Sequence, residues 1–105
     1  MNTGLRKHKS ATLRVAVPEA LPQHMQEGVR EILSVQCSNP KKGHATRLLR
    51  EVCAEADRSG TVLMLEARAF DDGMDDAQLK AWYMRSGFVQ TQESPIIMAR
   101  RPRDS

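Results

Sequence analysis

A short apolar run, a glycine turn and a strongly patterned segment follow one another between residues 32 and 60. Ile32 to Cys37 has the composition of a β-strand, and the apolar residues between Ala45 and Ala56 recur at the spacing of one helix face. Gly43 lies in the turn before the helix, and Gly60 stands where a helix commonly ends. A strand that leads through a glycine turn into a helix can bind anions, because the first N–H groups of a helix have no partner within it. The pattern therefore predicts a site for a phosphate-bearing cofactor.

A second apolar run, Val62 to Leu65, follows this helix and predicts a short strand that is covered on both faces. Strand, helix and strand at this spacing indicate a βαβ unit whose two strands are parallel and joined by a right-handed crossover. On the first strand, Leu33, Val35 and Cys37 are expected to share one face. The chain has 105 residues, and we expect a single α/β domain over residues 1–105.

The remaining elements have weaker patterns that end at proline, glycine or acidic turns. Leu13 to Val17 alternates as a strand does and is closed by Pro18. The acidic stretch Asp71 to Asp76 predicts a turn and the N-cap of a helix that ends at Gly87. The other predicted elements are a short helix at most within Pro22 to Gly28 and two final strands, Phe88 to Thr91 and Ile96 to Ala99, joined by a turn over Gln92 to Pro95.

The glycine turn does not match the two commonest phosphate motifs. No Gly-Lys-Ser/Thr follows four spacer residues, as a P-loop requires, and Gly43-His44-Ala45 lacks the further glycine of the dinucleotide-binding fingerprint. Pro40-Lys41-Lys42-Gly43-His44-Ala45 instead resembles the pyrophosphate loop of the GNAT-type N-acetyltransferases, with proline at the position of the family's leading Arg or Gln. Trp82-Tyr83-Met84-Arg85-Ser86-Gly87-Phe88 resembles the family's aromatic-Tyr-x-x-x-Gly-Phe segment. Residues 30 to 100 are thus similar to this family.

The resemblance implies a fold, an activity and a site. The fold is a GNAT-like mixed sheet with a central βαβ unit and flanking helices. The activity is transfer of acetyl from acetyl-CoA to a primary amine of a small molecule or protein, by direct attack. By resemblance, Tyr83 is the acid that protonates the coenzyme A sulfur, as a phenol can. The cofactor would be held at its pyrophosphate by Lys42, Gly43, His44, Ala45 and Thr46, and along its pantetheine arm by backbone groups of Val35, Gln36 and Cys37.

Several of these assignments have alternatives. The glycine turn could serve only to connect a strand and a helix, and Tyr83 could be a core aromatic. Asp76 stands where many members carry an asparagine that contacts the cofactor, which places an anion near a polyanionic ligand. The sequence identifies no general base: Glu31, Glu66 and His44 are candidates, but an exposed Glu or a loop His is usually solvated surface. The alternative function is a catalytically weak or inactive module that binds CoA or a partner.

Composition narrows the remaining classes. Much of the formal net charge of +3 comes from residues 1–10 and 101–105, which we expect to be flexible tails. Four aromatic residues are too few for a surface that stacks nucleic-acid bases, so nucleic-acid binding is not expected. No stretch approaches the roughly 18 apolar residues of a membrane span. With no secretory signal pattern at the start, we expect a cytoplasmic protein without membrane contact.

The cysteines and acidic residues do not predict a metal site. The acidic stretch lacks the spacing of an EF-hand loop. Cys37 and Cys53 have no CxxC or His partner spacing and are expected to be reduced core residues. A core of this size gains stability by burying surface against a second copy, so we expect a two-fold homodimer with Ile96 to Ala99 as the contact.

Overall fold

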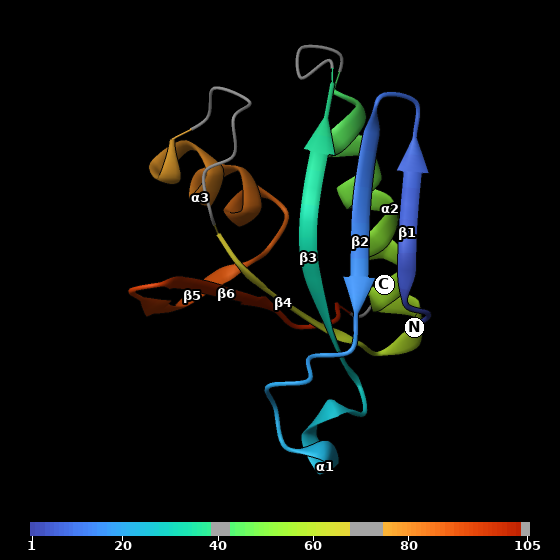
Figure 1. Cartoon of the computed structure of the whole chain (residues 1–105), viewed down its shortest axis with the longest axis vertical. Coiled ribbons are helices and arrows are strands. Elements are labelled where there is room, and N and C mark those ends of the chain that lie inside the picture. The colour runs from blue at the N-terminus through green and yellow to red at the C-terminus, as the bar shows by residue number, and fades with distance from the viewer. Residues whose placement is uncertain (39–42, 68–74, 104–105) are drawn as a thin grey trace.

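The computed structural model describes residues 1–38, 43–67 and 75–103. Within these residues, six strands form one mixed sheet in the order β1-β2-β3-β4-β6-β5. Figure 1 shows α2 behind β1, β2 and β3, with the β5–β6 hairpin running across their direction. The strands are β1 (Gly4–His8), β2 (Ala11–Ala16), β3 (Val29–Cys37), β4 (Val62–Glu66), β5 (Val89–Glu93) and β6 (Ile96–Arg100), and the helices are α1 (Gln23–Gln26), α2 (His44–Ser59) and α3 (Asp76–Arg85).

The central unit is β3-α2-β4, and its two strands are parallel, as the sequence predicts. Gly43 is the N-cap of α2 with φ of 72°, and Gly60 is its C-cap with φ of 67°. Both angles lie in the left-handed region that glycine adopts readily. The N–H of Gly60 donates to the carbonyls of Ala56 and Asp57, which satisfies groups that the end of the helix would leave without partners.

The side chains of β3 alternate differently from the prediction, because the strand contains a β-bulge. The antiparallel register with β2 pairs Arg14 with Ser34 but Val15 with Ile32, so Leu33 is an extra residue. Ile32 and Val35 therefore both point into the core, with exposed fractions of 3% and 6%, whereas Leu33 is 51% exposed. The prediction that Leu33 shares a face with Val35 and Cys37 is wrong, because the bulge changes the alternation between the two halves of the strand.

The sequence predicts a flexible tail over residues 1–10, but Gly4 to His8 within them form strand β1. Gly4 to His8 pairs antiparallel with Ala11 to Val15, and the tight turn between the strands places Lys9 at φ of 52°. Arg6 forms an ion pair with Glu55 of α2, and the hydrogen bond from its guanidinium lowers the pKa of the Glu55 carboxyl. The sequence pattern missed this strand because its more buried residues are Gly4, Arg6 and His8, while its one apolar side chain of any size, Leu5, is exposed.

The C-terminal half follows the prediction, with two differences. Asp75 caps α3 in a capping box with Gln78, so the acidic stretch does supply the cap, although Asp71 to Gly73 lie outside the described residues. The β5–β6 hairpin extends through Glu93, which leaves a tighter turn than the predicted one. Strand β6 lies between β4 and β5, so the predicted dimer contact over Ile96 to Ala99 has no free strand edge.

The core is formed by residues of the sheet, α2 and α3. No described helix has both the length and the apolar character needed to cross a membrane. On β4, Leu63 and Leu65 are buried while Val62 and Met64 are partly exposed, so the strand is well covered on one face only. Cys53 is 5% exposed, and burial raises the pKa of its thiol. The largest fully buried side chains are Phe88, Leu13, Leu49, Leu63, Leu65, Met98, Val15, Val52 and Pro18.

Candidate active site

Strands β3 and β4 separate halfway along β3. Their parallel register runs from Val29 opposite Val62 to Ile32 opposite Leu65 and includes none of the later β3 residues. Beyond this point β4 stays with β6, and the N–H of Ala67 donates to the carbonyl of Ile96 at 2.8 Å. Figure 1 shows the two strands diverging towards the end where α2 begins. The β3 segment that contains Val35, Gln36 and Cys37 thus has β2 on one side and, among the residues that the structure describes, no ladder with β4 on the other.

The N-terminal end of α2 follows this open segment. The first hydrogen bond of the helix runs from the N–H of Arg47 to the carbonyl of Gly43, at 3.1 Å. No side chain of the described residues caps the helix, and its first turn carries no acidic residue. A Cβ built on Gly43 would meet no atom within 4 Å. The positive end of the helix therefore opens on a side where a ligand could approach the backbone.

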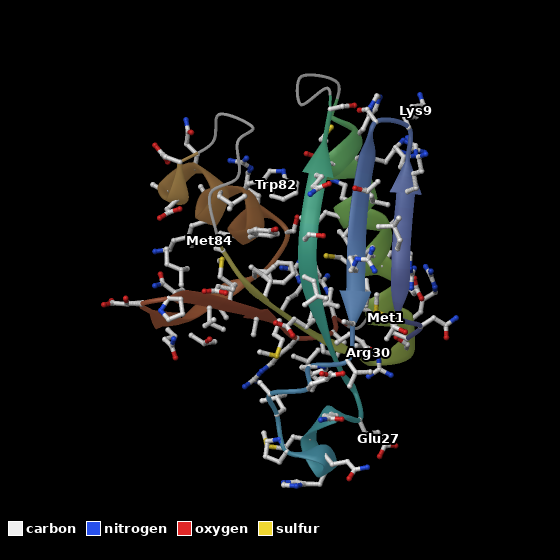
Figure 2. All side chains as sticks on the ribbon, viewed as in Figure 1. Met1, Lys9, Glu27, Arg30, Trp82 and Met84 are labelled. Atoms are coloured by element: carbon white, nitrogen blue, oxygen red, sulfur yellow. The ribbon has the colours of Figure 1, made fainter. Side chains whose placement is uncertain are left out.

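The first turn of α2 contains three of the predicted cofactor residues. His44, Ala45 and Thr46 are partly buried in this turn. Lys42, which the sequence assigns to the same role, lies outside the described residues. Across to α3, the indole N–H of Trp82 donates to Thr46 Oγ1 at 3.0 Å. Figure 2 shows Trp82 on the side of α3 that is turned towards β3 and α2. The hydrogen bond joins the two segments that carry the family motifs.

A second set of contacts holds the same turn from the other side. The Ser10 hydroxyl is hydrogen-bonded to His44 Nδ1, and the N–H of Ser10 donates to the same nitrogen at 3.4 Å. The hydroxyl also lies 3.3 Å from the Cys37 sulfur, and the rings of His8 and His44 meet edge to face with centroids 5.8 Å apart. Sequence reasoning did not find Ser10, because nothing in its local sequence indicates a contact 34 residues away.

Tyr83, on α3, is buried in the hydrophobic core of the protein, with an exposed fraction of 3%. Its ring centroid is 4.9 Å from that of Trp82 and 5.5 Å from that of Phe88, in tilted and edge-to-face arrangements. These aromatic contacts fix the ring, and aromatic pairs of this kind add to the energy of burial. The packing that the alternative assignment expects is therefore present, and it also gives the phenol a fixed position.

Two of the three candidate bases line separate cavities. Glu31 lines a cavity of about 560 Å³ that also touches Arg14 and Leu33, beside the bulge. Glu66 lines another of about 450 Å³ together with Asp76, at the end of β4. Asp76 and Glu66 thus share one cavity, and the third candidate, His44, belongs to the α2 turn described above. No group of His, Cys, Asp and Glu able to hold a metal ion occurs among the residues that the structure describes.

Comparison with known proteins gives matches by structure. No family model matches the sequence, and no curated protein matches it. The anti-CRISPR protein AcrVA5 matches with a TM-score of 0.73 at 15% identity, over 94% of this chain and 98% of that one. The ribosomal-protein-S18-alanine N-acetyltransferase of Escherichia coli matches with a TM-score of 0.63 at 17% identity, over 91% and 63%. An acyl-CoA N-acyltransferase of Pseudomonas aeruginosa gives 0.57 at 25% identity, over 91% and 65%.

These matches confirm the predicted fold class, a mixed sheet with a central βαβ unit and flanking helices. The chain spans just under two thirds of the length of the E. coli and P. aeruginosa enzymes and nearly all of AcrVA5. The separation of β3 from β4 and the uncapped start of α2 thus occur in a chain that shares its fold with solved N-acetyltransferases.

Proposed function

We propose that this chain, which has the fold of the GNAT-type N-acetyltransferases, transfers the acetyl group of acetyl-CoA to a primary amine by direct attack. The observation that carries the proposal is the separation of β3 from β4 directly before the uncapped, glycine-started helix α2. A thioester arm needs backbone donors and acceptors along its length, and a pyrophosphate needs clustered N–H groups. The two features offer both, in consecutive segments of the chain.

Cofactor binding is assigned to backbone groups more than to side chains. The pyrophosphate would lie at the first turn of α2, where the helix dipole favours an anion and Gly43 permits close approach. We include Lys42 in this role with His44, Ala45 and Thr46. The pantetheine arm would follow the β3 edge at Val35, Gln36 and Cys37, which forms no ladder with β4.

The chemical step needs a leaving-group acid and a neutral amine. The amine nitrogen attacks the acetyl carbonyl, the carbon–sulfur bond breaks, and the coenzyme A thiolate takes a proton from the Tyr83 hydroxyl, which solvent then restores. The amine releases its own proton to solvent or to a base, for which Glu31 and Glu66 are the candidates that line cavities. A phenol is a suitable acid for a thiolate, because its pKa near 10 is close enough to that of a thiol for the proton to be transferred.

Thiol release tests the reaction. The protein is incubated with acetyl-CoA and a panel of primary amines, both small molecules and lysine peptides, while free coenzyme A thiol is followed. Amine-dependent thiol release at a catalytic rate is expected. Acetyl-CoA binding without release for any amine would leave the alternative of a CoA-binding or partner-binding module. Absence of both would remove the cofactor proposal.

We place the protein in the cytoplasm. Both cysteines are free thiols, which is compatible with a reducing compartment.

The two glycines that bound α2 give a matched test of the pyrophosphate turn. Gly43 and Gly60 have nearly the same φ, and a Cβ on either would meet no atom within 4 Å. Gly43→Ala and Gly60→Ala should therefore lose similar stability, about 1 kcal/mol each, from the left-handed backbone. Acetyl-CoA should raise the melting temperature of wild-type and Gly60→Ala protein. We expect at least half of that increase to be lost in Gly43→Ala, because the methyl group would crowd the phosphates.

Equal ligand-induced shifts in the two alanine variants would contradict the assignment of the turn. The measurement is a thermal melt with and without acetyl-CoA, and the unliganded melts of the variants serve as the stability control.

A homodimer remains part of the proposal, with its contact moved from β6 to the face of the sheet opposite α2. Leu5 and Leu33 are 56% and 51% exposed, and the strand register places them on either side of β2 around Arg14. Exposed leucines that lie together on one sheet face are typical of surfaces buried in assemblies. Light scattering at micromolar concentration should give a dimer mass for wild-type protein and a monomer mass for Leu33→Glu. A monomeric wild-type protein would remove the dimer.

A further inference from the structure

A third cavity, of about 230 Å³, is lined by basic residues from three parts of the chain. Helix α2, the C-terminal end of α3, and the end of β6 with the segment after it all contribute to it. Four of its lining residues are arginines and one is an aspartate, which leaves three positive charges in excess. The lining residues that matter here are Arg50, Asp57, Arg85, Ser86, Arg100 and Arg103.

One of the four arginines is used by the fold itself. Arg100 is only 4% exposed, and its two terminal nitrogens donate to the two carboxylate oxygens of Asp57 at 2.7 and 3.1 Å. Its Nε donates to the carbonyl of Ser86 at 2.8 Å. Asp57 neutralises the charge of Arg100, and Asp57 and Ser86 together accept hydrogen bonds from all three guanidinium nitrogens. The positive excess therefore belongs to the other three arginines.

Among the residues that the structure describes, Arg50 and Arg85 have no counter-charge, and the charge that acts on Arg103 is that of Asp57, which already pairs with Arg100. No hydrogen bond or ion pair joins the side chains of Arg50, Arg85 or Arg103 to any described residue. Arg50 and Arg85 are exposed side chains on neighbouring helices that line the same cavity. Like charges that share a cavity repel one another, and an anion between them would remove that repulsion.

Arg103 is held at this cavity by its backbone and by a glycine. Its N–H donates to Asp57 Oδ1 at 2.8 Å, and its guanidinium lies against Gly87. A Cβ on Gly87 would overlap that guanidinium, with Cζ only 2.9 Å away. The guanidinium thus occupies space that any other residue at position 87 would fill, so packing and the backbone position this cation without a side-chain ion pair among the described residues.

We propose that this cavity binds a phosphate dianion, either free inorganic phosphate or the phosphate of a small monoester. Guanidinium groups match phosphate oxygens in paired, charge-assisted hydrogen bonds, and three arginines other than Arg100 line this cavity. The Ser86 hydroxyl lines the same cavity and can donate a further hydrogen bond. Arg50, the α2 residue of this cavity nearest the start of the helix, follows Gly43 by seven residues, which is about 10 Å along α2. The site is therefore separate from the turn proposed for the cofactor and independent of that proposal.

Calorimetric titration at low ionic strength tests this site, with inorganic phosphate and adenosine monophosphate as separate probes. The test variant is Arg50→Gln/Arg85→Gln. The matched control is Arg58→Gln/Arg101→Gln, which changes net charge equally through exposed arginines outside the cavity. All four side chains are exposed and make no hydrogen bond in the described structure, so both variants should melt as the wild type does. Phosphate affinity should fall at least tenfold in the test variant and less than twofold in the control.

Tighter binding of the nucleotide would identify a phosphate monoester as the ligand, and equal binding would identify the phosphate group alone. Both results support the site. The proposal is overturned if wild-type protein shows no saturable binding of either probe, or if both variants lose affinity equally, because net charge alone would then explain the binding. Displacement of phosphate by acetyl-CoA would also overturn it, since the two sites would not be separate.

Discussion

Turnover of Tyr83→Phe is expected to be about 100-fold below that of the wild type, with the acetyl-CoA-induced rise in melting temperature unchanged. A positioned general acid contributes about 100-fold or more to the rate, and this substitution removes only the hydroxyl. The ring should keep its place between Trp82 and Phe88, whose centroids lie 4.9 and 5.5 Å from it. The measurement is the rate of thiol release at saturating acetyl-CoA, with thermal melts beside it.

Trp82→Phe is the matched control on the same helix. It also keeps an aromatic ring and removes one polar group, the N–H that donates to Thr46 in the first turn of α2. Because that turn is the proposed pyrophosphate site, this variant should raise KM for acetyl-CoA and change kcat less than tenfold. Equal kcat in wild type and Tyr83→Phe would return the tyrosine to a purely structural role. A large loss of stability in Tyr83→Phe would point the same way.

The sequence was sufficient for elements whose signals are local. The βαβ unit followed from apolar spacing between residues 32 and 65, and both ends of α2 followed from its glycines, because a left-handed residue is needed there and glycine adopts that conformation readily. The start of α3 followed from the acidic stretch. β1 could not be predicted in this way, because its more buried residues are Gly4, Arg6 and His8, so the strand has no apolar alternation to reveal it.

The bulge in β3 is a feature of the candidate site that the sequence could not predict. Whether an extra residue is inserted opposite β2 depends on the register of two strands, which a single strand's sequence does not contain. The sequence therefore named Val35, Gln36 and Cys37 only through a resemblance, whereas the structure adds the end of the β3–β4 ladder at Ile32. Contacts between distant segments, such as Ser10 with His44, have no local signature.

Asp57→Asn should lower the free energy of unfolding by about 3 kcal/mol at pH 7. The substitution leaves Arg100 buried without an anion, and removing one partner of a buried ion pair costs about 3 to 5 kcal/mol. We take the lower value because the Asp57 side chain is 24% exposed. For a chain of this size the melting temperature should fall by more than about 10 °C. The matched control is Glu51→Gln, whose ion pair with Arg47 is exposed and long, at 3.7 Å, and should change stability by less than about 1 kcal/mol.

The same ion pair should make unfolding pH-dependent in the acid range. The hydrogen bonds from the Arg100 guanidinium, with a smaller contribution from the Arg103 N–H, lower the pKa of Asp57 from 3.8 to about 2. A carboxylate with a lowered pKa stabilises the fold above its unfolded pKa, and that contribution is lost as the pH falls through the folded one. Wild-type protein should therefore lose up to about 2 kcal/mol through Asp57 between pH 5 and pH 2. The difference in stability between wild type and Asp57→Asn should shrink over the same interval, as denaturant titrations at each pH would measure. A constant difference from pH 5 to pH 2 would mean that the charge of Asp57 does not hold β6 to α2.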